Sequence, residues 1–179
     1  MMTNIVIVDD EVGVLNALKR SLRNKGWRIQ TYSDPNEALS RVAEEEVDLV
    51  ISDYRMPEMN GVTLLQEVMA VQPDCVRMVL SGQADMDGVL AAINQAEIFR
   101  FITKPWSDAE LVCAIEQGLS YRRVHLENRR LANLVREQQV QIDYQKSELE
   151  RLEQESPGIT QIEFDDEGAI VIDAGDYNR

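Results

Sequence analysis

The sequence contains few of the residues that disulfide-bonded, membrane-spanning and nucleic-acid-binding proteins require. Its 179 residues include 2 cysteines and 1 histidine, and no apolar run approaches the roughly 20 residues that span a bilayer. Cys75 and Cys113 lie far apart in the chain, so we expect two reduced and mostly buried thiols. Basic residues number 18 against 32 acidic ones, a net charge of −14. This charge disfavours direct binding to nucleic acid or to an anionic membrane, because phosphates would be repelled.

The remaining composition is that of a folded domain inside the cell. Hydrophobic residues make up 44% of the chain, which excludes a wholly disordered protein. The first residues, MMTNIVIVDDE, carry no basic stretch and are not a signal peptide. We therefore expect a cytoplasmic protein with one α/β domain and an appendage.

Residues 1–120 alternate between short apolar runs and amphipathic stretches, which predicts a doubly wound α/β domain with a five-stranded parallel sheet. Asp34, Pro35 and Glu37 form a helix-start signal, and Ser107 with Glu110 forms a second one. The predicted strands are residues 4–8, 27–32, 48–52, 76–80 and 99–103. The predicted helices are residues 11–24, 35–44, 61–71 and 85–96, with a fifth beginning after residue 106.

A heptad repeat begins at Tyr121 and predicts that the fifth helix continues, from about 108 to 154, into a coiled coil covering residues 121–155. Seven of the ten core positions over five heptads are apolar. Asn128 at a core position favours a parallel homodimer. The predicted coiled-coil core residues are Tyr121, Val124, Asn128, Leu131, Val135, Ile142, Leu149 and Leu152.

The final segment, residues 156–179, is an acidic tail that begins with Ser156-Pro157-Gly158. Apolar and polar residues alternate on both sides of a glycine-containing turn, a pattern that predicts a C-terminal β-hairpin.

Three carboxylates follow predicted strands and define a candidate metal site. Asp9 and Asp10 follow the first strand, and Asp53 follows the third. In a doubly wound sheet of order 2-1-3-4-5 these strands are neighbours, and their carboxyl ends form the ligand site. A cluster of carboxylates with open water positions suits Mg²⁺.

The same edge of the sheet receives a hydroxyl and an ammonium group. The fourth strand is followed by Ser81 and Gly82, and the fifth by Lys104 and Pro105. A metal site, a carboxylate nucleophile, a hydroxyl donor and a cation are the parts that phosphoryl transfer needs.

Four motifs, VDDE, SDYRMPEMNG, SGQAD and FRFITKPW, together resemble the receiver domains of two-component response regulators over residues 3–120. The resemblance implies a flavodoxin-like fold and a phosphoryl group accepted by Asp53 from a histidine kinase or phosphotransfer protein. It also implies that Mg²⁺ (or Mn²⁺) is bound by Asp10, Asp53 and the main-chain oxygen of Arg55, with Asp9 acting through water. The protein would then be no enzyme beyond its own phosphorylation and dephosphorylation.

The resemblance assigns further roles around the phosphoryl group. Ser81 would contact it, Gly82 would leave room for it, and Lys104 would pair with it after a cis peptide bond to Pro105. Phe101 matches the aromatic switch residue that moves with Ser81. Arg55 and Gln83 occupy the positions that tune hydrolysis.

The last matching segment, FRFITKPW, is similar to the receivers of hydrogenase-type transcriptional regulators and HD-GYP phosphodiesterases. Three functions stay open. The first is a receiver whose phosphorylation switches a dimeric coiled coil. The second is an adaptor that binds a partner through the coiled coil and hairpin, or a receiver fragment of a longer regulator. The third, a haloacid-dehalogenase-type hydrolase, is disfavoured because Asp9 and Asp10 are adjacent. The sequence contains no recognisable output module, which leaves the downstream partner open.

Overall fold

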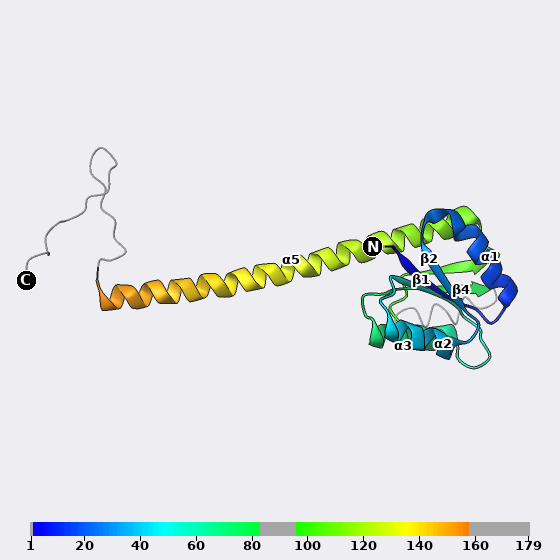
Figure 1. Ribbon diagram of the computed structural model, residues 1–179, viewed down its shortest axis with the longest axis horizontal. Helices are drawn as coiled ribbons and strands as arrows, with labels where there is room; N and C mark the ends of the chain where they lie inside the picture. The colour runs from blue at the N-terminus through cyan, green and yellow to red at the C-terminus, as the bar shows by residue number, and fades with distance from the viewer. Residues whose placement is uncertain (1, 83–95, 158–179) are drawn as a thin grey trace, which may run out of the picture. The chain divides into compact units, whose positions relative to one another are not determined.

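The computed structural model describes residues 2–82 and 96–157. Among the described residues, helices separate the first four strands along the chain, and a long helix follows the fifth strand (Figure 1). The predicted helix at 85–96, apart from Ala96, and the predicted hairpin lie outside the described residues. The strands are β1 (Asn4–Val8), β2 (Arg28–Tyr32), β3 (Leu49–Asp53), β4 (Val76–Gly82) and β5 (Arg100–Lys104).

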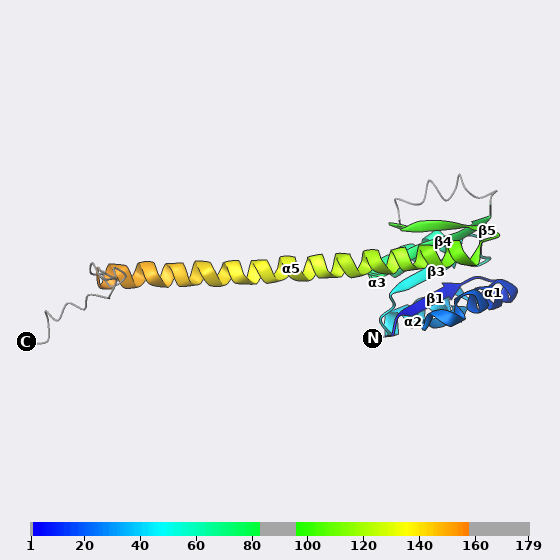
Figure 2. The ribbon, with the colours of Figure 1, turned by 90° about the horizontal axis from the view of Figure 1, so that it is seen from above.

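The strands form one parallel sheet in the order β2-β1-β3-β4-β5, which confirms the predicted order 2-1-3-4-5 (Figure 2). β1 has the predicted bounds, and the other four strands differ from the predicted ones by one or two residues at an end. The predicted third strand ends before Asp53, whereas β3 includes it, because Asp53 still pairs with Leu80 of β4. The phosphoacceptor candidate is therefore a residue of the sheet itself.

Helices cover both faces of this sheet (Figure 1). Side chains alternate between the faces along each strand. The helices are α1 (Val12–Leu22), α2 (Pro35–Glu44), α3 (Gly61–Val71) and α5 (Asp108–Glu155), and a short 3₁₀ turn, η1 (Arg23–Lys25), follows α1. In β1, Ile5 and Ile7 join the core under α1 and α5, while Val6 and Val8 join the core under α2 and α3.

Side-chain caps fix the beginnings of two helices. The carboxylate of Asp34 accepts a hydrogen bond from the Asn36 amide at 2.7 Å, and Pro35 is the first helical residue, as predicted. The side chain of Asn60 caps α3 by accepting from the Thr63 amide at 2.9 Å. Such caps contribute about 1 kcal/mol each. The Asn60 cap also fixes the start of α3 directly after the loop that follows Asp53.

Helix α5 has 48 residues, in agreement with the predicted continuous helix. The chain divides into two units, residues 1–127 and 128–179. The first unit extends past the predicted boundary at 120, because Tyr121 and Arg122 still contact the sheet domain. Within residues 2–82 and 96–157, no helix combines the length and apolar character needed to cross a membrane.

Candidate functional site

Four polar side chains lie at the carboxyl edge of the sheet, where four neighbouring strands end. Asp9 directly follows β1, and Asp53 is the last residue of β3. Ser81 lies near the end of β4, and Lys104 ends β5. The ladder pairs Ser81 with Thr103 and Gly82 with Lys104, so the last two strands end level with each other. The parallel sheet thus brings together residues that are up to 95 positions apart.

The ammonium group of Lys104 binds two carboxylates at once. Its Nζ lies 2.7 Å from Asp9 Oδ2 and 2.5 Å from Asp53 Oδ1. Asp9 is fully buried and Asp53 is 7% exposed. Two buried carboxylates this close repel each other, and the cation between them offsets that repulsion.

Backbone amides orient the other oxygen of each carboxylate. The Glu11 amide donates to Asp9 Oδ1 at 2.9 Å, and the Arg55 amide donates to Asp53 Oδ2 at 2.9 Å. Each carboxylate is therefore held between a main-chain donor and Lys104. This arrangement fixes the position of the Asp53 oxygens before any reaction begins.

Burial dominates the electrostatics of this cluster. It raises the pKa of Asp9, and the hydrogen bonds from Lys104 and from the Glu11 amide offset that rise only in part. Burial also disfavours the charged form of Lys104, but the hydrogen bonds to Asp53 and Asp9 outweigh it and raise the pKa of the lysine. Lys104 is therefore a firmly protonated cation at neutral pH.

The oxygen donors at this edge are of the type that Mg²⁺ prefers. The structure brings Asp9 and Asp53 together, while Asp10 is exposed. Among residues 2–82 and 96–157, no three His, Cys, Asp or Glu side chains already converge into a metal-binding group. The buried pair carries two negative charges against the single charge of Lys104, so a divalent cation complements the site. In sequence, Asp10 directly follows Asp9, and Arg55 lies two residues after Asp53.

The remaining predicted residues surround this cluster. Ser81 is buried, and its hydroxyl donates to the main-chain oxygen of Gly82 at 3.2 Å. Phe101 is partly buried against the core under α2 and α3. The peptide bond from Lys104 to the following proline is cis. Gln83 lies outside the described residues.

Gly61 lies against the Asp53 backbone, a position that the sequence motifs do not indicate. It begins α3, and a Cβ added to it would lie 1.9 Å from the main-chain oxygen of Asp53 and 2.8 Å from Ser52 Oγ. Helix α3 therefore packs its backbone directly against the backbone of the phosphoacceptor candidate. The sequence signal was Asn60-Gly61, a helix cap followed by the smallest residue.

Two aspartates held by a lysine at the carboxyl edge of a 2-1-3-4-5 sheet define the class of protein. The family model "response regulator receiver domain" matches residues 5–116. The chain belongs to this family, the receiver domains of two-component response regulators.

Curated relatives are transcriptional regulators that match over their receiver domains. The hydrogenase transcriptional regulatory protein HoxA of Cupriavidus necator is 35% identical over 115 residues, which are 64% of this chain and 24% of HoxA. The transcriptional regulatory protein GlrR of Escherichia coli is 36% identical over 116 residues, or 65% of this chain and 26% of GlrR. The matched region thus spans about a quarter of these relatives' length.

The matches to solved structures extend over nearly the whole of each solved chain. The signal receiver domain of an HD domain-containing protein from Pseudomonas fluorescens has a TM-score of 0.66 and 35% identity, covering 69% of this chain and 99% of that one. A structure of adenylate cyclase from Rhodopirellula baltica has a TM-score of 0.70 and 28% identity, covering 74% and 98%. The predicted similarity to receivers of hydrogenase-type regulators is confirmed. For the predicted similarity to HD-GYP phosphodiesterases, the solved structure shows the coarser likeness to a receiver of an HD domain-containing protein.

Proposed function

We propose that this receiver accepts a phosphoryl group on Asp53 from a sensor histidine kinase or a phosphotransfer protein. The observation that carries the proposal is the Asp53 carboxylate itself. It is buried at the end of β3, oriented by the Arg55 amide at 2.9 Å, and bound by Lys104 at 2.5 Å. An oriented carboxylate beside a fixed cation is suited to attack phosphorus, because the developing charge is neutralised at once.

The transfer forms one bond and breaks another. An oxygen of Asp53 attacks the phosphorus of a phosphohistidine, and the phosphorus–nitrogen bond breaks with its electron pair remaining on the imidazole. Asp10, Asp53 and the Arg55 main-chain oxygen would hold Mg²⁺ or Mn²⁺, with Asp9 acting through water, and the ion would supply further positive charge. Lys104 keeps its bond to Asp9 and pairs with a phosphoryl oxygen in place of the Asp53 carboxylate.

The acyl phosphate formed on Asp53 is lost by attack of water. In our proposal Arg55 and Gln83 flank the phosphoryl group and set its lifetime, and Arg55 is exposed to solvent. The chain thus catalyses only its own phosphorylation and dephosphorylation.

Ser81 and Phe101 form the proposed switch. The Ser81 hydroxyl, which donates to the Gly82 oxygen, turns toward the phosphoryl group, and Gly82 leaves the space for it. Movement of β4 at Ser81 changes the packing of Phe101, which lies opposite Val79 in the neighbouring strand. A differential stabilisation of a few kcal/mol suffices to shift such an equilibrium.

The proposed output is a parallel homodimer formed by residues 121–155 of α5. Apolar side chains at the predicted core positions are exposed, among them Val135 at 63% and Ile142 at 55%. A helix with an exposed apolar stripe at heptad spacing is stabilised when a second copy covers it. The regulator would act in the cytoplasm through this dimer, with no direct contact to nucleic acid.

Sedimentation with and without beryllofluoride and Mg²⁺ tests the switch and the dimer together. We expect beryllofluoride to change the oligomer of the wild type and to leave Asp53→Ala unchanged. Ile142→Asp should convert the dimer into a monomer, because the dimer would bury an unpaired charge between the two helices. The matched control Ser147→Asp, on the outer face of the same helix, should remain dimeric. An unchanged oligomer for Ile142→Asp would contradict the coiled coil.

A further inference from the structure

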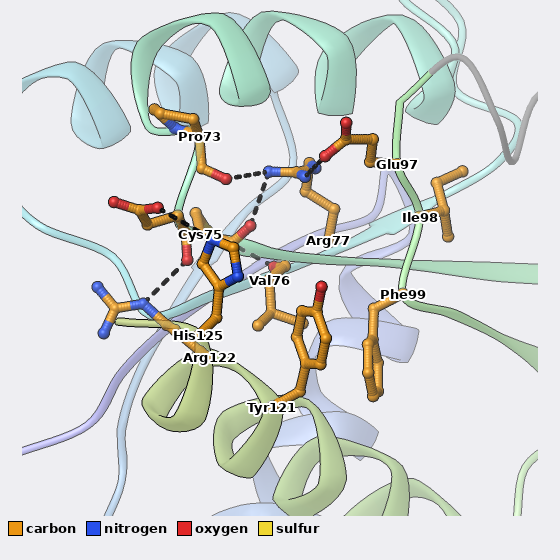
Figure 3. A pocket seen from close by; sticks show the side chains of 11 residues that line it. Pro73, Cys75, Val76, Arg77, Glu97, Ile98, Phe99, Tyr121, Arg122 and His125 are labelled. Atoms are coloured by element: carbon orange, nitrogen blue, oxygen red, sulfur yellow. Dashed lines mark hydrogen bonds and ion pairs between the residues drawn. The ribbon is translucent and has the colours of Figure 1, made fainter. Parts of the chain in front are cut away.

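Arg122 of α5 binds the residues that precede two strands of the sheet. Its Nη1 donates to Asp48 Oδ1 at 2.6 Å, and its Nε donates to the main-chain oxygen of Asp74 at 3.1 Å. Its Nη2 also donates to Glu46 at 2.7 Å. Figure 3 shows Arg122 reaching from α5 to this backbone, at one wall of a cavity of about 540 Å³. The Arg122 side chain is only 12% exposed, so its ion pairs are less screened than surface pairs.

The two strands that begin beside Arg122 are those that carry the site at their far ends. Asp48 directly precedes β3, which ends at Asp53. Asp74 lies just before β4, which carries Ser81. Every residue of β3 is buried, and so is every residue of β4 except the last. Two tightly packed strands therefore connect the phosphoacceptor and the switch residue to one guanidinium group.

The groups that Arg122 binds are themselves fixed. The second oxygen of Asp48 accepts from the Asn4 amide at 2.8 Å, at the start of β1. The buried Arg77 holds the Asp74 segment from the other side (Figure 3), because it donates to the main-chain oxygens of Pro73 at 3.1 Å and Cys75 at 2.8 Å.

Helix α5 lies close against the sheet one turn before Arg122. A Cβ on Gly118 would be 2.7 Å from Met78 Cε and 2.9 Å from Val76 Cγ1. The helix begins at Asp108, shortly after Lys104 at the opposite edge of the sheet. Residues 108–122 are thus attached covalently at the phosphorylation edge and by Arg122 at the other.

We propose that Arg122 is a positioning residue that couples the state of Asp53 to the helix beyond residue 122. It is the fixed point about which the start of α5 moves when the Asp53 edge rearranges. The contact transmits that movement because its partners, Asp48 and the Asp74 backbone, lie just before the two strands of the site. The inference rests on the proposed function and names the residue through which that function is relayed.

The experiment compares full-length wild type with Arg122→Ala, using Arg123→Ala as the matched control. Arg123 is exposed, and its described contact is a 3.4 Å hydrogen bond to Ser120 Oγ. Each protein is phosphorylated with acetyl phosphate and Mg²⁺, sedimented with and without beryllofluoride, and followed by hydrogen exchange over residues 119–127. Arg122→Lys is a milder variant that retains the charge and one of the contacts.

We expect Arg122→Ala to be phosphorylated within about twofold of the wild-type rate, since Arg122 lies at the opposite edge of the sheet. Its exchange over residues 119–127 should rise several-fold, and the beryllofluoride response of the oligomer should be lost. Arg122→Lys should be intermediate and Arg123→Ala unchanged. A wild-type oligomer response or unchanged exchange in Arg122→Ala would overturn the proposal. So would a tenfold loss of phosphorylation in both Arg122 variants, since the arginine would then support the whole fold.

A wild type that is phosphorylated without any change of oligomer would refute the proposed output and with it the coupling by Arg122. A wild type that is not phosphorylated at all would refute the proposed phosphoacceptor instead. Hydrogen exchange separates these results from a failure of the Arg122 contact alone, because unchanged protection in Arg122→Ala contradicts that contact whatever the oligomer does.

Discussion

Replacing Gly61 with alanine tests the close contact between α3 and the phosphoacceptor strand. The new Cβ would lie 1.9 Å from the main-chain oxygen of Asp53, a distance at which backbone must move. Overpacking of this kind costs about 1–3 kcal/mol, and the upper end applies because the neighbour is backbone. Alanine regains up to about 1 kcal/mol through helix propensity. The net loss is about 2 kcal/mol, a factor of roughly 30 in the unfolding equilibrium.

Urea denaturation followed by circular dichroism measures this loss, and two other glycines serve as references. Gly13→Ala, in α1, has nothing within 4 Å of its Cβ and should stabilise the protein by about 0.5–1 kcal/mol. Gly118→Ala meets the flexible end of Met78 and the stiffer Val76, so its loss should be smaller than that of Gly61→Ala. Wild-type stability of Gly61→Ala would refute the reasoning. A loss of stability in Gly13→Ala but not in Gly61→Ala would refute it as well.

Two further predictions concern the buried titratable groups. In metal-free buffer Lys104→Gln should lose stability at pH 7 and recover part of it as the pH falls toward 5. Burial already raises the pKa of Asp9, so in this variant Asp9 accepts a proton as the pH falls and no longer repels Asp53. Equal losses of stability at pH 7 and pH 5 in chemical denaturation would contradict this. Burial raises the pKa of the Cys75 thiol to about 12, whereas Cys113 is exposed. Iodoacetamide at pH 7.5 should therefore modify Cys113 in the native protein and both thiols after denaturation, as intact mass spectrometry would show. Labelling of Cys75 in the native protein would contradict its burial.

Strand positions, and the placement of Asp9 and Asp53 at the ends of strands, followed from the sequence because they depend on local pattern. Apolar runs marked the strands, and acidic or basic residues marked their ends. A parallel sheet then has few ways to place Asp53 beside Asp9, so the prediction that they meet held. The continuous helix α5 was predictable for the same reason, since no proline or cap interrupts it between Asp108 and Glu155.

The parts that sequence analysis missed depend on distances between elements. Nothing in the residue pattern states that Gly61 touches the Asp53 backbone, or that Lys104 binds both aspartates. Arg122 stands in a heptad repeat, where an arginine is usually solvated. Its contact with Asp48, made by a largely buried side chain, arises because α5 packs against the sheet at an angle and distance that packing sets. Such contacts are properties of the folded chain.

Intact mass spectrometry after incubation with acetyl phosphate tests the central claim most directly. With Mg²⁺ present, the wild type should gain the mass of one phosphoryl group, and Asp53→Asn should gain none. Wild type in EDTA should also gain none, and Asp10→Asn should react far more slowly than wild type with Mg²⁺. Equal phosphorylation of wild type and Asp53→Asn would contradict the account, because the phosphoryl group would then reside on a different residue.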